Sequence, residues 1–196
     1  MRKINILTIF ICVILLIFSQ ILYIKAEPKM ATNFELRDPW DYEFSLEQFK
    51  DNPVILHFFR IYCGGRITRQ SVKQIQELNK VCAKLCEGEK CTEGDIHIIS
   101  ITLATCPTTD LKEWAEYFNI NWLLGNDYDD YKLDIIKDYS EYLSKLRDPA
   151  LIFVSKNQEI VFSSNYLDAS KIIEKLEEIS QTDQSKTSEN GNIKNR

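Results

Sequence analysis

The sequence predicts an α/β domain with a mostly parallel sheet, flanking helices and an antiparallel edge hairpin. Apolar runs of strand length alternate with helical patterns from residue 34 onward, which is the signature of β-α units. The run at 54–59 is apolar on both faces, as in a central strand of a parallel sheet that helices cover, and 96–103 is predicted to be a second central strand. Only a short turn separates the last two strands, so we expect them to form a hairpin.

In the first half of the domain, strand and helix signals alternate clearly. Ser45 is a plausible N-cap for a helical turn, and Pro53 marks the start of the first buried strand. Apolar residues at three- and four-residue spacing then predict one buried helix face. In chain order, the expected elements are a short strand at 34–38, a helical turn after Ser45, a strand at 54–59, a helix at 72–85 and a strand at 96–103.

The second half continues the pattern and ends in the hairpin and a last helix. Thr109 or Asp110 can cap a helix, and the turn at 156–157 separates the two final strands. In chain order, we expect a helix ending at 118, a strand at 122–124, a loop at 126–130, a helix to about 146, strands at 150–155 and 159–163, and a helix at 169–179.

The two ends of the chain differ in composition from the domain at 34–180. Arg2 and Lys3 precede an apolar run in residues 1–25, which reads as a signal anchor or a signal peptide. We expect residues 4–24 to enter the membrane and the domain to lie on the extracytoplasmic side, or to be secreted. Residues 26–33 read as a polar linker. Residues 181–196 are almost free of apolar side chains, and we expect this tail to be disordered.

The net charge and the number of cysteines limit the classes of function that the chain can have. The net charge is −5 and no basic cluster is present, which argues against nucleic-acid binding. Of the six cysteines, Cys12 lies in the N-terminal apolar segment, which leaves five for an oxidising compartment. Because five is odd, at least one thiol is free or pairs only transiently.

Cys82, Cys86 and Cys91 form a close group in the sequence. On a helix, Cys82 and Cys86 share one face, and Cys91 follows in a loop. A structural disulfide that uses Cys91 is one interpretation, and simple burial of Cys82 is another. A zinc site is a third, but it needs a fourth ligand that the neighbouring sequence does not supply.

Cys63 is the candidate nucleophile because it follows a central strand and precedes a helix. The N–H groups and dipole of a helix start lower the pKa of a thiol. Gly64 and Gly65 allow close approach of a substrate, and the positive charge of Arg66 favours the thiolate. An inert, half-buried cysteine in a glycine turn is the alternative.

Cys106 is the candidate resolving partner of Cys63. It lies just beyond the second central strand, and in open α/β sheets ligands bind at the carboxyl edge of the strands. A loop cysteine that never meets Cys63 is the alternative.

Four segments of the chain carry a resemblance to a known family. They are Phe34-x-Leu36-x-Asp38, Ser45-Leu46-x-x-Phe49, the step from Phe58 to Arg66 and the Asp148-Pro149 step. Together they resemble the thioredoxin-like superfamily, in its redoxin branch. That branch includes peroxiredoxin-like proteins, membrane-anchored thiol–disulfide oxidoreductases and Sco-type copper chaperones. The resemblance covers about residues 33–180. It implies a cis peptide bond before Pro149, facing the active cysteine and contributing to substrate binding.

Three departures from the family pattern matter for function. Arg66 stands where related oxidoreductases carry a second cysteine, and the Pro and Thr of peroxiredoxins are missing. A copper site would need a histidine, and His57 and His97 both fall inside expected strands, where core packing is the simpler interpretation. Residues 127–130 are acidic but lack the glycine and distal glutamate of a calcium loop. We expect no metal and no cofactor.

Two functions from different classes follow. The leading hypothesis is an extracytoplasmic thiol-dependent oxidoreductase that acts through Cys63 on a disulfide or a peroxide, with a thiol or disulfide protein as partner. The alternative is a non-catalytic thioredoxin-like binding module. A Sco-like copper chaperone is a weaker third possibility.

Overall fold

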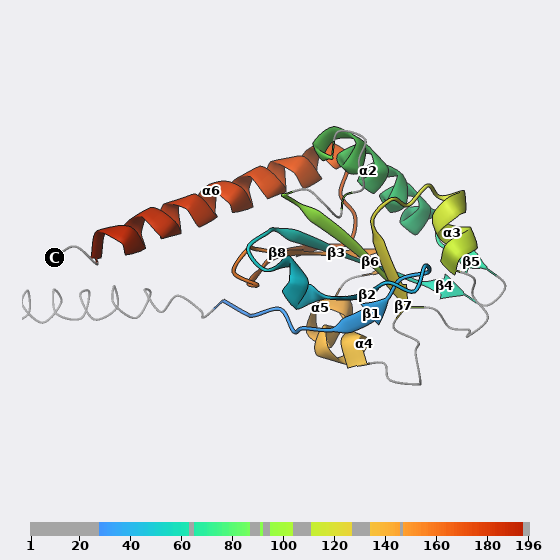
Figure 1. The fold of residues 1–196 in the computed structure, drawn as a ribbon. Helices are drawn as coiled ribbons and strands as arrows, with labels where there is room; N and C mark the ends of the chain where they lie inside the picture. The colour runs from blue at the N-terminus through green and yellow to red at the C-terminus, as the bar shows by residue number, and fades with distance from the viewer. Residues whose placement is uncertain are drawn as a thin grey trace, which may run out of the picture.

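The computed structural model describes residues 28–62, 65–86, 91, 95–103, 111–126, 134–145 and 147–193. Its centre is a five-stranded sheet with the strand order β7-β6-β3-β8-β9 (Figure 1). The strands are β3 (Val54–Phe59), β6 (His97–Thr102), β7 (Leu123–Asn126), β8 (Ala150–Val154) and β9 (Ile160–Ser164).

Strand direction divides the sheet into two parts. β7, β6 and β3 run parallel, whereas β8 pairs antiparallel with β3, and β9 pairs antiparallel with β8. The expected edge hairpin is therefore confirmed. The sheet as a whole is mixed rather than mostly parallel, because the hairpin's first strand joins β3 in the antiparallel sense.

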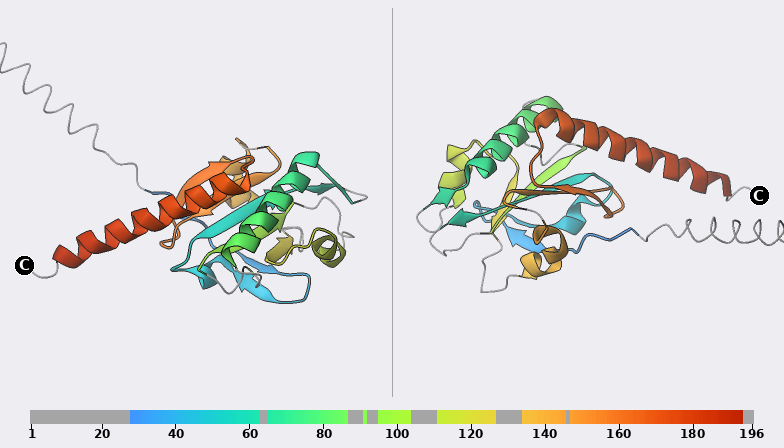
Figure 2. Two further views of the ribbon diagram at one scale, coloured as in Figure 1. Left: turned by 90° about the horizontal axis from the view of Figure 1, so that it is seen from above. Right: turned by 180° about the vertical axis from the view of Figure 1, so that it is seen from behind.

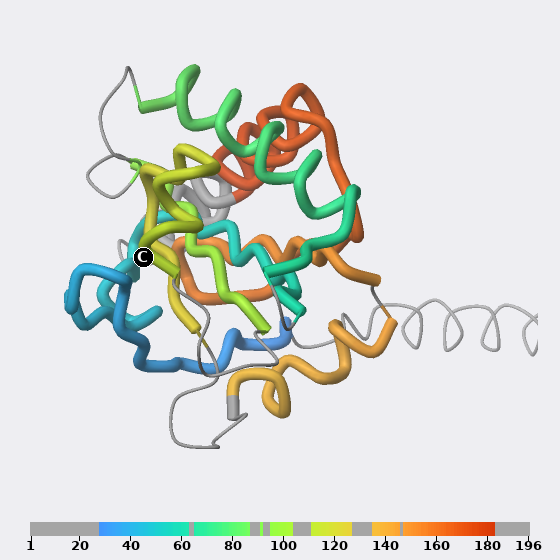
Figure 3. The backbone as a smooth tube through the Cα atoms, turned by 90° about the vertical axis from the view of Figure 1, so that its right-hand side faces the viewer, coloured from blue at the N-terminus to red at the C-terminus, as the bar shows by residue number. Residues whose placement is uncertain are grey.

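Helices cover both faces of the sheet (Figures 1 and 3). On one face lie α2 (Arg69–Leu85), α3 (Leu111–Tyr117) and α6 (Ala169–Ile193). The other face carries α4 (Asp134–Asp138), α5 (Ser140–Leu143), the 3-10 turn η1 (Leu46–Phe49) and the hairpin of β1 (Glu35–Arg37) and β2 (Glu43–Ser45). This arrangement produces one apolar core on each face of the sheet.

The central strand β3 shows why its sequence is apolar throughout. Ile55 and Phe59 pack into the core beneath α2 and α6, whereas Val54, Leu56 and Phe58 pack into the core on the opposite face. All six residues of the strand are buried. Successive side chains point to opposite faces, so both faces must be apolar, as the sequence pattern predicts.

The helix expected after residue 130 is two short helices, α4 and α5, with Tyr139 between them. The Tyr139 side chain is buried, and its hydroxyl donates a hydrogen bond to the Thr32 carbonyl at 2.8 Å. Its ring also packs against Phe34 and Phe58. The break places one aromatic side chain in the core, which the spacing of apolar residues alone does not indicate.

Both ends of the domain extend beyond the expected boundaries. The Ala31 N–H donates to the Gln158 carbonyl at 2.7 Å, and the Ile160 N–H donates to the Lys29 carbonyl at 2.8 Å. Part of the expected linker thus pairs with the β8-β9 turn. α6 continues to Ile193 and projects away from the sheet (Figure 2).

The backbone of α6 is helical beyond residue 181, where the sequence predicts a disordered tail. Ser180 and Thr182 each donate a side-chain hydrogen bond to the carbonyl four residues earlier. A polar composition does not prevent a helix from continuing past its last packed turn. No helix within the described residues is long and apolar enough to cross a membrane. Residues 1–25 lie outside the described part.

Gly125 on β7 is a sensitive packing position. A Cβ at this residue would lie 2.6 Å from Leu36 Cδ1 and 3.0 Å from Leu36 Cβ. We expect Gly125→Ala to reduce the free energy of unfolding by about 1–3 kcal/mol, because overpacking forces β1 to shift. Urea unfolding measures the change. Combined with Leu36→Ala, the loss should be clearly smaller than the sum of the single losses, whereas strict additivity would contradict the proposed contact.

Candidate thiol site at the carboxyl edge of the sheet

The carboxyl ends of β3 and β6 lie side by side. Phe59 is paired in register with Thr102, and the Leu103 N–H donates to the Phe59 carbonyl at 2.8 Å. Cys63 follows the end of β3 by four residues, and Cys106 follows the end of β6 by four residues. The two strands therefore deliver both cysteine-bearing segments to the same edge of the sheet.

The described residues include only part of the expected site. Cys63, Gly64 and Cys106 lie outside them, as does the acidic loop at 127–130. Gly65, Arg66 and Pro149 are described. The geometry of the site is thus defined by the elements that surround the Cys63 segment.

A small hairpin corrects the expected step from strand to helix. β4 (Ile61–Tyr62) and β5 (Arg66–Ile67) pair antiparallel, with Tyr62 opposite Arg66. α2 begins only at Arg69, after the N-cap Thr68. Arg66 therefore lies in a strand, and five residues separate Cys63 from the first residue of α2. Apolar spacing in α2 indicates the helix but not where its first turn begins.

Gly65 and Arg66 occupy different environments in this hairpin. Gly65 has a φ of 71°, in the left-handed region that favours glycine, and its N–H donates to the Tyr62 carbonyl at 3.1 Å. A Cβ at Gly65 would lie 3.9 Å from Trp114 Cζ2 of α3. Arg66 is exposed. Its guanidinium is a positive charge on the surface three positions after Cys63.

Asp148 ties three separate segments together at this edge. Its Oδ1 accepts a hydrogen bond from the Ser71 hydroxyl at 2.8 Å and from the Arg60 N–H at 3.1 Å. Ser71 belongs to the first turn of α2, where its N–H is capped by the Thr68 hydroxyl at 3.1 Å. The carboxylate thus joins the end of β3, the start of α2 and the segment before β8.

The second carboxyl oxygen of Asp148 differs from the first in its surroundings. Oδ2 is buried and has no hydrogen-bond partner among the described residues. Burial raises the pKa of Asp148 above its usual value, and the hydrogen bonds from Ser71 and Arg60 oppose that rise. A carboxyl with one anchored and one unpartnered oxygen can take up or release a proton without losing its position.

Sequence reasoning missed Asp148 as a site residue. The Asp148-Pro149 step is visible in the sequence, but it draws attention to the proline. The partners of the carboxylate, Arg60 and Ser71, lie 88 and 77 positions away in the chain. An acidic residue directly before a proline and a buried strand is the one local signal that could have indicated it.

The peptide bond between Asp148 and Pro149 is cis, as the family resemblance implies. Ala150, the next residue, begins β8 and pairs with Phe58 of β3. This pairing holds the proline segment next to the strand that leads to the Cys63 hairpin. The hairpin, the start of α2 and the proline segment therefore converge at one edge.

Both histidines are core residues, as expected. His57 is fully buried, with Nδ1 2.9 Å from the Ser100 hydroxyl, which also accepts the Trp122 indole N–H at 2.8 Å. His97 Nε2 lies 3.2 Å from Asn52 Nδ2. Desolvation lowers the pKa of both imidazoles, to about 3 for His57. Neither histidine faces the carboxyl edge as an accessible base or metal ligand.

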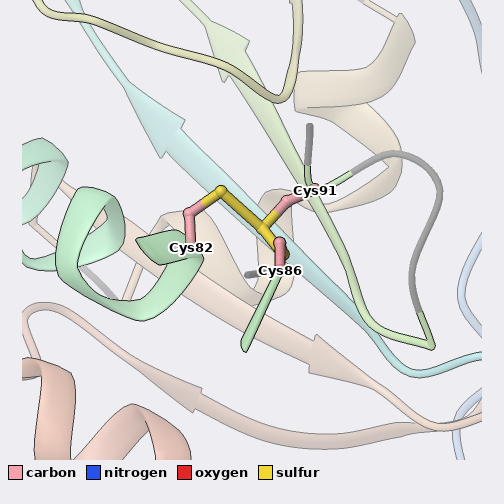
Figure 4. Close-up of side chains that lie close together, drawn as sticks. All are labelled: Cys82, Cys86 and Cys91. Atoms are coloured by element: carbon pink, nitrogen blue, oxygen red, sulfur yellow. A yellow bond between two sulfur atoms is a disulfide. The ribbon is translucent and has the colours of Figure 1, made fainter. Parts of the chain in front are cut away.

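The second cysteine group lies at the far end of α2 (Figure 4). Cys91 lies in disulfide-bonding geometry with Cys82 and with Cys86, which confirms that Cys91 takes part in a disulfide. Their sulfur atoms all lie within 4.8 Å of one another, and no fourth ligand joins them among the described residues. Such a group is compatible with disulfide chemistry without any metal.

No protein-family model matches the sequence, and a search of curated proteins gives no match. Solved structures do match. A thioredoxin-family thiol:disulfide interchange protein from Chlorobium tepidum has a TM-score of 0.64 and 12% sequence identity, over 79% of this chain and 98% of that one. A secreted disulfide oxidoreductase from Mycobacterium tuberculosis has a TM-score of 0.54 and 14% identity, over 73% and 93%.

The third similar structure is BsSco, of the Sco family of cytochrome c oxidase assembly proteins. It has a TM-score of 0.60 and 14% identity, over 80% of this chain and 96% of that one. Each match spans almost all of the compared protein, so the shared part is the whole domain rather than a fragment. The chain therefore has the thioredoxin-like fold, and its structural neighbours are thiol–disulfide oxidoreductases and a Sco protein.

Proposed function

We propose that the chain is an extracytoplasmic thiol–disulfide oxidoreductase whose nucleophile is Cys63. The observation that carries the proposal is the convergence of the Cys63 hairpin, the start of α2 and the Asp148-Pro149 segment at one sheet edge. The structural neighbours with this fold include thiol–disulfide oxidoreductases, which supports the reaction class. The apolar segment in residues 1–25 supports the location, either as an anchor or as a cleaved signal.

In the proposed reaction, the Cys63 thiolate attacks one sulfur of a partner disulfide. A mixed disulfide forms, and the partner's other sulfur leaves as a thiolate that takes up a proton. A second thiol then attacks Cys63 and releases the reduced partner. Cys106 is our candidate for this second thiol, because its segment leaves the sheet beside that of Cys63. Arg66 supplies positive charge near the thiolate, and Gly64, Gly65 and Pro149 contact the substrate.

A copper-chaperone function is less well supported. The only histidines in the chain are His57 and His97, and both lie in buried strands. A copper site at the carboxyl edge would therefore lack the imidazole ligand that the Sco resemblance implies. Attack on a peroxide would use the same nucleophile, but the thiolate would bond to a peroxide oxygen, the O–O bond would break, and the products would be a sulfenic acid and hydroxide or an alkoxide.

We expect Cys63→Ser to slow reduction of a peptide disulfide by the full chain at least 100-fold, because the thiolate is the attacking group. Cys106→Ser should still form the mixed disulfide but should accumulate it. Tryptic cleavage yields Cys63 alone in peptide 61–66, so mass spectrometry can follow the adduct directly. Unchanged disulfide reduction by Cys63→Ser would contradict the proposal. A Cys63 pKa near the free-thiol value of about 8.5 would favour the binding module.

A further inference from the structure

The three cysteines at the end of α2 offer two alternative disulfides. The Cα atoms of Cys82 and Cys91 lie 5.9 Å apart, and those of Cys86 and Cys91 lie 5.5 Å apart. Both separations fall in the range of about 4.4–6.8 Å that disulfides span. One sulfur forms one disulfide at a time, so the backbone permits two oxidised states that share Cys91 (Figure 4).

Cys82 has a partner when it is a free thiol. Its sulfur lies 3.1 Å from the Asn121 side-chain oxygen, which can accept a hydrogen bond only from a protonated sulfur. This contact fits the state in which Cys86 and Cys91 are bonded and Cys82 is reduced. The free thiol remains within 4.8 Å of both bonded sulfurs, close to the bond that it would attack.

We propose that this group is a thiol–disulfide exchange centre in which Cys91 switches between Cys86 and Cys82. The deprotonated Cys82 sulfur attacks Cys91, a Cys82–Cys91 bond forms, and the Cys86–Cys91 bond breaks. Cys86 leaves as a thiolate and takes up the proton that Cys82 lost. One disulfide and one thiol are present before and after, so the step needs no external oxidant or reductant.

The exchange changes which thiol solvent can reach. Cys82 and Cys91 are each 2% exposed, whereas Cys86 is partly exposed at the C-cap of α2. The exchange therefore moves the free thiol from the core to the surface, where Cys86 can react with a small disulfide or a partner protein's disulfide. Buried thiols are protected from such reagents. Cys86 becomes available to them as a free thiol only after Cys82 has displaced it from Cys91.

This centre is separate from the proposed Cys63 site. α2 has 17 residues, so its two ends lie about 25 Å apart along the helix axis. Cys63 precedes the start of α2, and the three cysteines lie at its end. Thiols at that separation cannot attack each other within a rigid domain. The two sites would need to react with partners independently.

The experiment measures native alkylation of Cys86 in the oxidised full chain. Trypsin cleaves after Lys80, Lys84 and Lys90, which places the three cysteines in peptides 81–84, 85–90 and 91–112. Fragment ions distinguish Cys91 from Cys106 in the last peptide. Iodoacetamide is added to the native protein, the reaction is stopped with acid, and the remaining disulfides are reduced and labelled with a heavier reagent.

We expect iodoacetamide to alkylate Cys86 in the wild-type chain. In Cys82→Ser, alkylation of Cys86 should be at least tenfold slower, because no internal thiol then displaces Cys86 from its disulfide with Cys91. Cys86→Ser should contain the Cys82–Cys91 disulfide alone. Cys106→Ser is the matched control and should leave the Cys86 rate unchanged. Cys82→Ala provides a second test if the serine variant folds poorly, as judged by its thermal unfolding.

Three results would overturn the exchange centre. The first is an equal rate of Cys86 alkylation in the wild type and in both Cys82 variants. The second is no labelling of Cys86 in the wild type. The third is that all three cysteines are reduced thiols that bind one zinc or copper(I) ion. Labelling of Cys63 is read separately in peptide 61–66. An unreactive Cys63 would contradict the proposed function while leaving this inference intact.

Discussion

The free energy of unfolding should fall by about 2–3 kcal/mol between about pH 7.5 and about pH 4.5 because of His57 alone. Burial lowers the pKa of this imidazole from 6.5 to about 3, so it is neutral in the folded protein across this range. In the unfolded chain, the same side chain takes up a proton below about pH 6.5. The stability that depends on neutral His57 is thus lost as the pH falls from about 6.5 towards 3.

The size of the effect does not depend strongly on the exact folded pKa. At pH 4.5 the unfolded imidazole is almost fully protonated, and the folded one is still largely neutral. Each unit between pH 6.5 and pH 4.5 then contributes about 1.4 kcal/mol. The buried surroundings explain the low pKa, since His57 Nε2 has no hydrogen-bond partner among the described residues.

Urea unfolding of the wild type and His57→Gln at several pH values measures this contribution. The variant should be less stable at neutral pH but should lose about 2–3 kcal/mol less on acidification. Other titrating groups, including His97 and Glu77, change equally in both proteins and cancel in the comparison. Identical pH dependence in the two proteins would show that His57 is protonated without unfolding.

Local patterns predicted the central elements of the fold. The buried strands β3 and β6 and the apolar face of α2 follow directly from residue spacing, and the terminal hairpin follows from its short turn. The expectations failed where tertiary packing decides the local structure. Tyr139 splits a helix because the core accommodates its ring. The extent of α6 to Ile193 has a different origin, since a helix can continue past its last packed turn.

The candidate site was predictable only in part, for a similar reason. Sequence position identifies the edge at which the Cys63 and Cys106 segments leave the sheet, because parallel strands end together. It does not reveal the Ser71–Asp148 contact, which joins residues 77 positions apart. It also does not reveal the small hairpin between Cys63 and α2, in which Arg66 pairs with Tyr62.

Asp148→Asn should slow disulfide exchange at Cys63 by about 100-fold without slowing its alkylation, a result that rests on the proposed function. Exchange releases a thiolate that takes up a proton, and the unpartnered Oδ2 of Asp148 belongs to a carboxyl held against the end of β3 and the start of α2. Alkylation needs no proton donor. Removing a nearby negative charge also favours the thiolate, so the alkylation rate should stay the same or rise.

Asp148→Ala separates this chemical role from the structural one. Asparagine keeps an oxygen to accept from Ser71 and Arg60, whereas alanine leaves both donors without their acceptor. Alanine should therefore reduce the free energy of unfolding by about 1–3 kcal/mol, and asparagine by much less. If both variants are equally destabilised and lose exchange and alkylation together, Asp148 only holds the β3 end against α2. If the asparagine variant loses exchange while keeping its stability and its alkylation rate, the carboxyl carries the proton.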